Sequence, residues 1–191
     1  MKKHVVLGLI LALTLTVSSQ TDATKQSVEK SVFGIQTGFL GIWIHNESRL
    51  SNTIALRSEI GLDTGISGGD VYGDVSVFYG PVITLEPRWY YNLNKRKTKS
   101  KRTDGNSGNF ISIKTSYHPD WFTINKPNNV IFLSDISIVP TWGIRRNIGK
   151  HFNYETGIGV GYAHVFKKDN VVLHDDPDVA VNLHLRIGYR F

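Results

Sequence analysis

The chain ends with the stretch VNLHLRIGYRF, residues 181–191. Every second residue of this stretch is apolar, and the residues between them are polar, charged or glycine. The apolar set is Val181, Leu183, Leu185, Ile187, Tyr189 and Phe191, and the other set is Asn182, His184, Arg186, Gly188 and Arg190. Strict alternation of this kind predicts a β-strand with one apolar face and one polar face.

The same period of two recurs along the chain, for example in NTIALRSEIGLD (52–63), FISIKTSY (110–117) and HFNYETGIGVGYA (151–163). No stretch after the first 20 residues has a sustained helical period. The alternation predicts strands over 32–45, 53–64, 76–92, 109–117, 130–146, 151–165 and 179–191. The sequence therefore predicts an all-β fold built from strands with one dry face and one wet face.

The N-terminus has the three parts of an export signal. A basic start, MKKH, precedes an apolar stretch from Val5 to Val17, and SSQ then supplies small residues for cleavage. A membrane-spanning helix would need about 20 apolar residues, more than this stretch contains. We therefore expect a signal peptide at 1–20, an N-terminal segment at 21–30 and one β-domain at 31–191.

Composition excludes several classes of protein. The 191 residues include no Cys, which rules out disulfides, thiolate metal sites and a lipid-anchored Cys after the signal. The net charge of +6 is concentrated in one basic stretch, which contains Lys95, Arg96, Lys97, Lys99, Lys101 and Arg102. A local charge run in an exported chain argues against a nucleic-acid partner. No residue pattern requires a cofactor.

A weak repeat places aromatic residues at corresponding strand ends. ITLEPRW (83–89) and ISIVPTW (136–142) share one pattern, and TGFLGIW (37–43) and LHLRIGY (183–189) partly match it. The repeat predicts a girdle formed by Trp43, Trp89, Trp142 and Tyr189, although chance similarity among strands is the alternative. Proline is unusual inside a strand, so we expect Pro87 and Pro140 at bulges.

Taken together, these features resemble the small outer-membrane β-barrels of double-membraned bacteria, most closely the eight-stranded OmpX-like and OmpA-transmembrane-domain type. The resemblance implies an antiparallel up-and-down transmembrane barrel with its apolar faces toward lipid. It also implies that outer-membrane lipids, lipopolysaccharide and the outer-membrane insertion machinery are partners. The C-terminal residues Leu185, Ile187, Tyr189 and Phe191 resemble the signal that this machinery reads, although Arg186 stands where Gly is common.

Barrels of this type have an even number of strands, and the alternation shows seven. We therefore predict eight, with either an extra first strand in KQSVEKSVFGIQ (25–36) and a tight turn near Gly38, or two strands merged within one of the seven ranges. If the C-terminus is periplasmic, the connections at 46–52, 93–107 and 145–150 are periplasmic, and those at 64–76, 118–129 and 167–178 are extracellular.

The polar faces of the strands carry charges of both signs, which the barrel would turn inward. The predicted lumen charge network comprises Arg57, Glu59, Asp63, Glu86, Arg88, Lys114, Arg145, Glu155 and Arg186. An eight-stranded lumen is narrow enough to be filled by side chains, and buried charges must pair. The prediction is a plugged barrel with a structural or surface-binding role, and a narrow ion path is the alternative.

An enzyme that modifies lipid A, of the deacylase or acyltransferase type, is a further alternative. Its candidate residues are Ser116 with His118, His151 with Glu155, and Asn182 with His184, but none of these pairs has a strong catalytic spacing. HDDPD (174–178) offers carboxylates for Ca²⁺, although a solvated acidic loop is the simpler interpretation. The basic stretch 93–107 is interpreted as a flexible solvated insertion, or else as a binding site for anionic headgroups or an acidic periplasmic partner.

Overall fold

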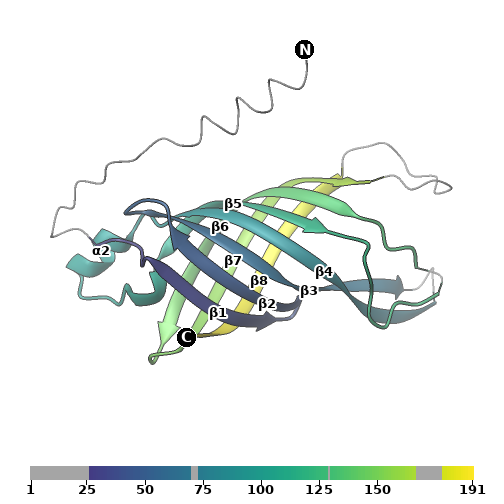
Figure 1. The fold of residues 1–191 in the computed structure, drawn as a ribbon, viewed down its shortest axis with the longest axis horizontal. Helices are drawn as coiled ribbons and strands as arrows, with labels where there is room; N and C mark the ends of the chain where they lie inside the picture. The colour runs from purple at the N-terminus through teal and green to yellow at the C-terminus, as the bar shows by residue number, and fades with distance from the viewer. Residues whose placement is uncertain (1–25, 70–72, 129, 167–177) are drawn as a thin grey trace, which may run out of the picture.

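Eight antiparallel strands form a closed barrel in the computed structural model, which describes residues 26–69, 73–128, 130–166 and 178–191 (Figure 1). The strands are β1 (Ser31–Gly38), β2 (Gly41–Arg49), β3 (Ile54–Gly69), β4 (Gly73–Trp89), β5 (Asn109–His118), β6 (Asp135–Ile148), β7 (Phe152–Val165) and β8 (Asp178–Arg190). Each strand pairs with the next, and β8 pairs with β1. The all-β, eight-stranded prediction is confirmed. The predicted signal at 1–20 and residues 21–25 lie outside the described residues.

The missing strand comes from the first predicted range. Residues 32–45 contain two strands, β1 and β2, joined by a tight turn at Phe39 and Leu40. Gly41 begins β2 with a φ of +146°, in the region where a side chain would be strained, so glycine fits this position best. Both solutions that the sequence left open are found here, because a tight turn follows Gly38 and one predicted range had merged two strands.

The prediction that Pro87 and Pro140 lie at bulges is wrong. Pairing of β4 with β5 is interrupted beside Pro87, and pairing of β6 with β7 beside Pro140, as expected for a residue without an N–H. The register is the same on both sides of each interruption, so no extra residue is inserted. Among the described strand pairs, a register shift lies elsewhere, between Ser67 and Gly69 of β3.

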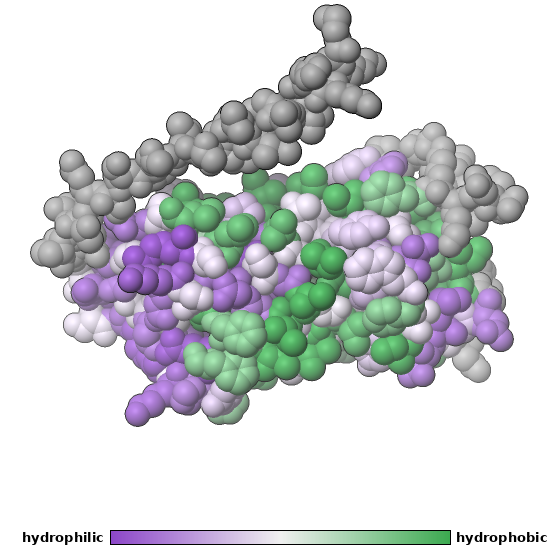
Figure 2. Space-filling view, viewed as in Figure 1, coloured by the Kyte–Doolittle hydropathy of each residue, from purple (hydrophilic) through white to green (hydrophobic). Residues whose placement is uncertain are grey.

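The barrel has an apolar outside and a polar inside. Along β8, Leu183, Leu185 and Ile187 face outward and are 61–66% exposed, whereas Arg186 between them is 3% exposed. Figure 2 shows hydrophobic side chains across the middle of the visible face and hydrophilic side chains gathered around the α2 end. This is the reverse of the polarity of a water-soluble barrel.

The strand directions sort the connections into two groups. The β2–β3, β4–β5 and β6–β7 connections share one end of the barrel with the C-terminus, here called the terminal end. The β1–β2 and β5–β6 connections lie at the opposite end, here called the far end, together with the last residues of β3 and β7 and the first residues of β4 and β8. This grouping matches the one expected from the sequence.

Residues 90–108, here called the cap, lie at the terminal end, where they connect β4 to β5. The cap contains a short α-helix, α2 (Leu93–Thr98), and a 3₁₀ helix, η1 (Asp104–Asn106). Its anchors belong to a buried apolar cluster made of Val28, Ala55, Tyr90, Leu93 and Phe110. Apolar packing therefore anchors this segment to the barrel, which the sequence did not predict, whereas residues 94–102 are largely exposed, as expected for a solvated insertion. Within the described ranges, no helix is long and apolar enough to cross a membrane.

Candidate functional site: the charged lumen

Glu47 on β2 is the hub of the lumen and is fully buried. Its Oε1 lies within 3.5 Å of a guanidinium nitrogen of each of three arginines: Arg57 at 3.5 Å, Arg88 at 3.0 Å and Arg145 at 2.7 Å. The Tyr90 hydroxyl donates a hydrogen bond to Glu47 Oε2 at 3.0 Å. A single carboxylate thus joins side chains from β3, β4, β6 and the cap.

Glu155 on β7 holds the opposite side of the same cluster. Arg88 donates to both of its oxygens, at 2.9 and 2.8 Å, in the bidentate geometry that gives the strongest arginine–carboxylate pairs. Arg145 donates to it through Nε at 3.0 Å. Arg88 also donates to Glu86 at 2.7 Å, and the Ser112 hydroxyl donates to the other oxygen of Glu86 at 2.6 Å.

Glu59 on β3 forms a second cluster closer to the far end. Arg57 donates to its Oε2 through two nitrogens, at 2.8 and 2.6 Å, and Arg186 donates to the same oxygen at 2.8 Å. The Arg186 guanidinium also lies over the Trp43 ring, 3.8 Å from its centroid. These contacts tie the final strand of the chain to β2 and β3.

The lumen network, defined by these ion pairs, has equal numbers of the two charges. It consists of Arg57, Arg88, Arg145 and Arg186 with Glu47, Glu59, Glu86 and Glu155, all buried. Desolvation of eight charges is tolerable only because each has close partners of opposite sign. The eight paired side chains of the network also occupy the interior of the barrel.

Seven of the nine residues predicted for the lumen lie in this network. Asp63 instead lies at the far mouth of the barrel, and Lys114 is half-buried and forms no ion pair with another described residue. Glu47, the hub, is missing from the predicted set because residues 46–52 were assigned to a turn. The alternation of Ile42 and Ile44 with Trp43, His45 and Glu47 is the signal that could have found it.

The far mouth contains a histidine between two carboxylates. His118 lies 3.1 Å from Asp63 through Nε2 and 2.9 Å from Asp135 through Nδ1. Ser116 faces Thr84 instead, at 3.0 Å between the hydroxyl oxygens. Both nitrogens of His118 thus contact carboxylates of other strands. Ser116 and His118, the pair considered for catalysis, do not hydrogen-bond to each other.

The other two catalytic pairs also lack an assembled arrangement. His151 contacts the carbonyl of Arg190 at the terminal end, at 3.1 Å, whereas Glu155 lies in the lumen network. His184 lies 3.3 Å from the Asn182 side chain, and no serine among the described residues hydrogen-bonds to either of them. Among the described residues, no group of His, Asp or Glu is arranged to hold a metal ion. Residues 174–177 of the candidate calcium loop lie outside the described residues.

Trp43 is not a girdle residue, which corrects the prediction. It faces inward and is 2% exposed, and its indole nitrogen donates to Asp63 at 2.6 Å. Gly61 on the neighbouring strand makes this possible, because a Cβ there would lie only 2.6 Å from the Trp43 ring. The first copy of the repeat also spans the β1–β2 turn, so its likeness to single strands is accidental.

The other three predicted girdle residues face outward on the terminal half of the barrel. Trp142 donates through its indole nitrogen to the Tyr91 hydroxyl at 2.9 Å, and the Trp89 ring centroid lies 5.9 Å from that of Tyr91. The Tyr189 ring packs edge-on against Phe152 at 5.4 Å. These residues form a belt of aromatic side chains beside the cap.

The cap reaches into the lumen network and also binds both ends of the barrel domain. Asn106 is fully buried, and its side-chain amide donates to Glu47 at 2.9 Å while its oxygen accepts from the backbone of Glu29. Asp104 accepts from Arg190 at 2.6 Å. Gly105 donates to Glu29, which lies in the segment before β1. The cap is therefore part of the closed lumen.

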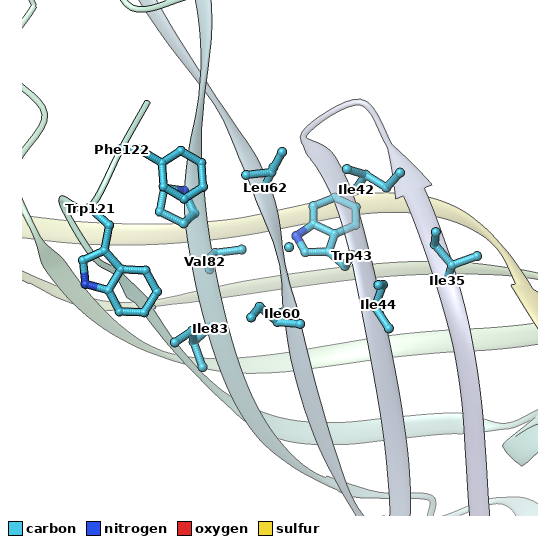
Figure 3. A pocket seen from close by; sticks show the side chains of 12 residues that line it. Ile35, Ile42, Trp43, Ile44, Ile60, Leu62, Val82, Ile83, Trp121 and Phe122 are labelled. Atoms are coloured by element: carbon cyan, nitrogen blue, oxygen red, sulfur yellow. The ribbon is translucent and has the colours of Figure 1, made fainter. Parts of the chain in front are cut away.

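An apolar groove of about 340 Å³ lies on the outer wall near the far end (Figure 3). Backbone hydrogen bonds between Tyr79 and Ile124, at 2.9 and 3.0 Å, hold the β5–β6 connection against β4. This contact brings Trp121 and Phe122 over the wall, opposite Ile60 and other outward-facing side chains of β1 to β4. The residues that line the groove are uncharged.

The chain matches no protein-family model, no curated protein and no solved structure.

Proposed function

We propose that this chain is an integral outer-membrane β-barrel protein of a double-membraned bacterium, with a plugged lumen and a structural or surface-binding role. The single observation that carries the proposal is the polarity of the closed barrel, which is charged inside and apolar outside. A cleaved export signal at 1–20 belongs to the same proposal.

A water-soluble barrel of the lipocalin kind would need the opposite polarity. Its apolar faces would line a ligand cavity, and its charged faces would meet water. Here the outward positions of β7 and β8, such as Ile158, Val181 and Leu183, are apolar and more than half exposed. A continuous apolar surface of this kind is unusual on a soluble monomer and is well matched to lipid.

The lumen network argues against a general diffusion pore. Arg57, Arg88 and Arg145 are each at most 1% exposed, which means that side chains occupy the middle of the barrel. The cap covers the terminal end as well. We therefore expect no stable open channel, and planar-bilayer recordings should show no sustained conductance above the baseline of protein-free bilayers.

Cell fractionation tests the location. The protein should be recovered in the outer membrane, resist extraction with carbonate, and change its mobility on SDS gels when it is heated. Recovery as a soluble periplasmic monomer would overturn the proposal. Mass spectrometry of lipid A from deletion and overexpression strains tests the enzyme alternative, and we expect an unchanged profile.

A further inference from the structure

The first hairpin of the barrel is shorter than the strands on either side of it. Pairing of β1 with β8 stops at Gly38 and Arg186, and pairing of β2 with β3 stops at Gly41 and Asp63. β8 continues to Asp178 and β3 to Gly69. Beyond the hairpin tip, in the described part of the chain, no strand lies between these two edges. The wall is thus interrupted on its far half.

A cavity of about 480 Å³ lies at this interruption, within the size range of small-molecule sites. Its apolar walls come from the hairpin tip and from outward-facing residues of β8: Phe39, Leu40, Val181, Leu183 and Leu185. Its other lining includes the inward-facing side chains of Trp43, His184 and Arg186. The cavity therefore runs from the apolar outer surface to the edge of the lumen network.

The inner end of the cavity has an unused hydrogen-bond donor. Arg186 is 3% exposed, and its Nε–H has no partner although its Nη1 pairs with Glu59. Buried donors are rarely left unpaired, because an unpaired polar group loses its hydrogen bonds to water without replacing them. This donor marks a position where an acceptor would be stabilised.

The charge of Arg186 itself favours an anionic acceptor. Glu59 is the carboxylate that Arg57 and Arg186 share, and Asp63, which accepts from Trp43, is a further carboxylate on this side of the lumen. Glu47, Glu86 and Glu155 pair with the other arginines further toward the terminal end. The free Nε–H of the Arg186 guanidinium would bind a charged acceptor more strongly than a neutral one, because hydrogen bonds between ionised groups are the stronger kind.

We infer that this opening binds a single-chain anionic amphiphile of the fatty-acid class. The carboxylate accepts from Arg186 Nε, and the acyl chain lies between the hairpin tip and the outward face of β8. A ligand of this kind has one charged end and one apolar end, as the cavity does. The inference rests on the proposed function, because the acyl chain of the ligand enters the opening sideways from the membrane.

Trp43 supplies a reporter inside the cavity. A variant that keeps only this tryptophan (Trp89→Phe, Trp121→Phe, Trp142→Phe) is reconstituted into dioleoylphosphatidylcholine vesicles and titrated with 9,10-dibromostearate, whose bromines quench indole fluorescence. A matched variant that keeps only Trp142, which faces outward, reports the general concentration of the probe in the bilayer. The methyl ester of the same fatty acid is the uncharged control.

We expect saturable quenching of Trp43 by the acid, with a half-saturation about tenfold below that of the ester, because a charged hydrogen bond is lost in the ester. Quenching of Trp142 should rise in proportion to probe content without saturation. Val181→Phe fills the cavity and should raise the half-saturation about fivefold or more. Val179→Phe, on the same face of β8 but outside the cavity lining, should leave it unchanged.

Three results overturn the inference. These are quenching of Trp43 that follows Trp142 without saturation, equal half-saturation for acid and ester, and equal effects of the two phenylalanine substitutions. Flotation of the same vesicles separates this failure from that of the proposed function. A chain that floats with the vesicles but fails these tests refutes the site alone, whereas a chain that does not float refutes both.

Discussion

Individual side chains in the lumen link strands that are far apart in the sequence. Arg88 on β4 contacts Glu47 on β2 and Glu155 on β7, and Arg186 on β8 contacts Glu59 on β3. Each of these residues therefore stabilises the closed barrel through its partners across the lumen as well as through its own strand. Loss of any one of them removes a counter-charge from buried partners of opposite sign, which is costly in the interior of the barrel.

Glu59→Ala tests this cross-linking. It removes the acceptor shared by Arg57 and Arg186, and we expect it to lower the free energy of unfolding by roughly 3 kcal/mol. The control is Ser58→Ala, one residue earlier on the outward face, which should have an effect within about 0.5 kcal/mol. Urea unfolding of both variants in the same detergent measures the difference. Equal losses would show that the inward and outward assignments are wrong.

At this scale the sequence predicted which face of each strand is charged but not which charges meet. Arg57 and Glu59 are assigned inward by alternation alone. The pairing of Glu47 with three arginines depends on the barrel register. Glu47 belongs to the strand that follows the tight turn at Phe39 and Leu40, but the sequence had assigned it to a loop. Trp43 was misplaced for a related reason, since only the register reveals that Gly61 leaves room for its ring.

Among the elements, the cap departs most from the expectation based on sequence. Its charge run suggested a solvated loop, but Tyr90 and Leu93 anchor it in an apolar cluster, and Asn106 extends to Glu47. These contacts join residues that are far apart in the sequence, and the segment has no period of its own. No local pattern could therefore have predicted them.

The attachment of the cap should depend on pH through Asp104. Hydrogen bonding to Arg102, together with the charges of Arg102 and Arg190, holds the pKa of the Asp104 carboxyl below its usual value. A lowered pKa means that the contribution to stability is present at pH values above the unfolded pKa of about 3.9 and is lost as pH falls through the folded value. We therefore expect the NMR amide signal of Gly105, in detergent micelles, to hold its position at neutral pH and to shift or broaden in acid.

The variant Asp104→Asn gives the matching test at neutral pH. It should show the Gly105 signal of the acid form already at pH 7, without a further shift on acidification. A pH dependence identical to that of the parent protein would mean that another group controls the cap.

The exposed lysines of the cap provide a test of binding to anionic lipid. Lys95, Lys97, Lys99 and Lys101 are exposed, whereas Arg96 and Arg102 make hydrogen bonds within the cap. Each lysine near a negative surface contributes about 1 kcal/mol at low salt. Replacement of the four lysines by Gln should weaken binding to phosphatidylglycerol vesicles and flatten its salt dependence, as measured by sedimentation.

The Gly105 amide signal serves as the control for that variant, because it reports whether the cap is still folded. Unchanged vesicle binding with an intact cap would show that the lysines only keep this end of the molecule solvated.

For the whole molecule, the alternation of apolar and polar residues predicted the strands, and the resemblance to small outer-membrane barrels implied that they close into a barrel. The strands after the first hairpin lie close to their predicted ranges, because each has a period of two that turns one face outward along its length. The even strand number of that class supplied the eighth strand, which alternation alone did not show. The interrupted wall beside β8 could not be predicted, since it depends on the relative lengths of strands that are paired only in the folded barrel.

The last residue of the chain allows a test of assembly as distinct from stability. Phe191 is exposed, and its ring contacts Phe33 and Tyr189 at centroid distances of 5.5 and 5.4 Å. We predict that deletion of Phe191 slows assembly in cells, with accumulation and proteolysis in the periplasm. In detergent the same variant should lose only about 1 kcal/mol of stability, because both of its ring contacts are on the exposed surface of the barrel.

The control is Phe152→Ala, which removes another exposed ring of the aromatic belt without touching the C-terminus. It should assemble at the normal rate. Normal assembly of the Phe191 deletion, or an equally large defect in detergent, would show that this residue serves only the folded barrel.

The position of the cap has a consequence for the order of folding events. Its contacts include Glu29, just before the first strand, and Arg190, at the end of the last one. These two partners come together only when the seam between β1 and β8 has formed. The cap, which comes from the middle of the chain, can therefore complete its contacts only after the first and last strands have paired. Protease resistance of the sites at Lys95 to Arg102 should mark the molecules in which the barrel has closed.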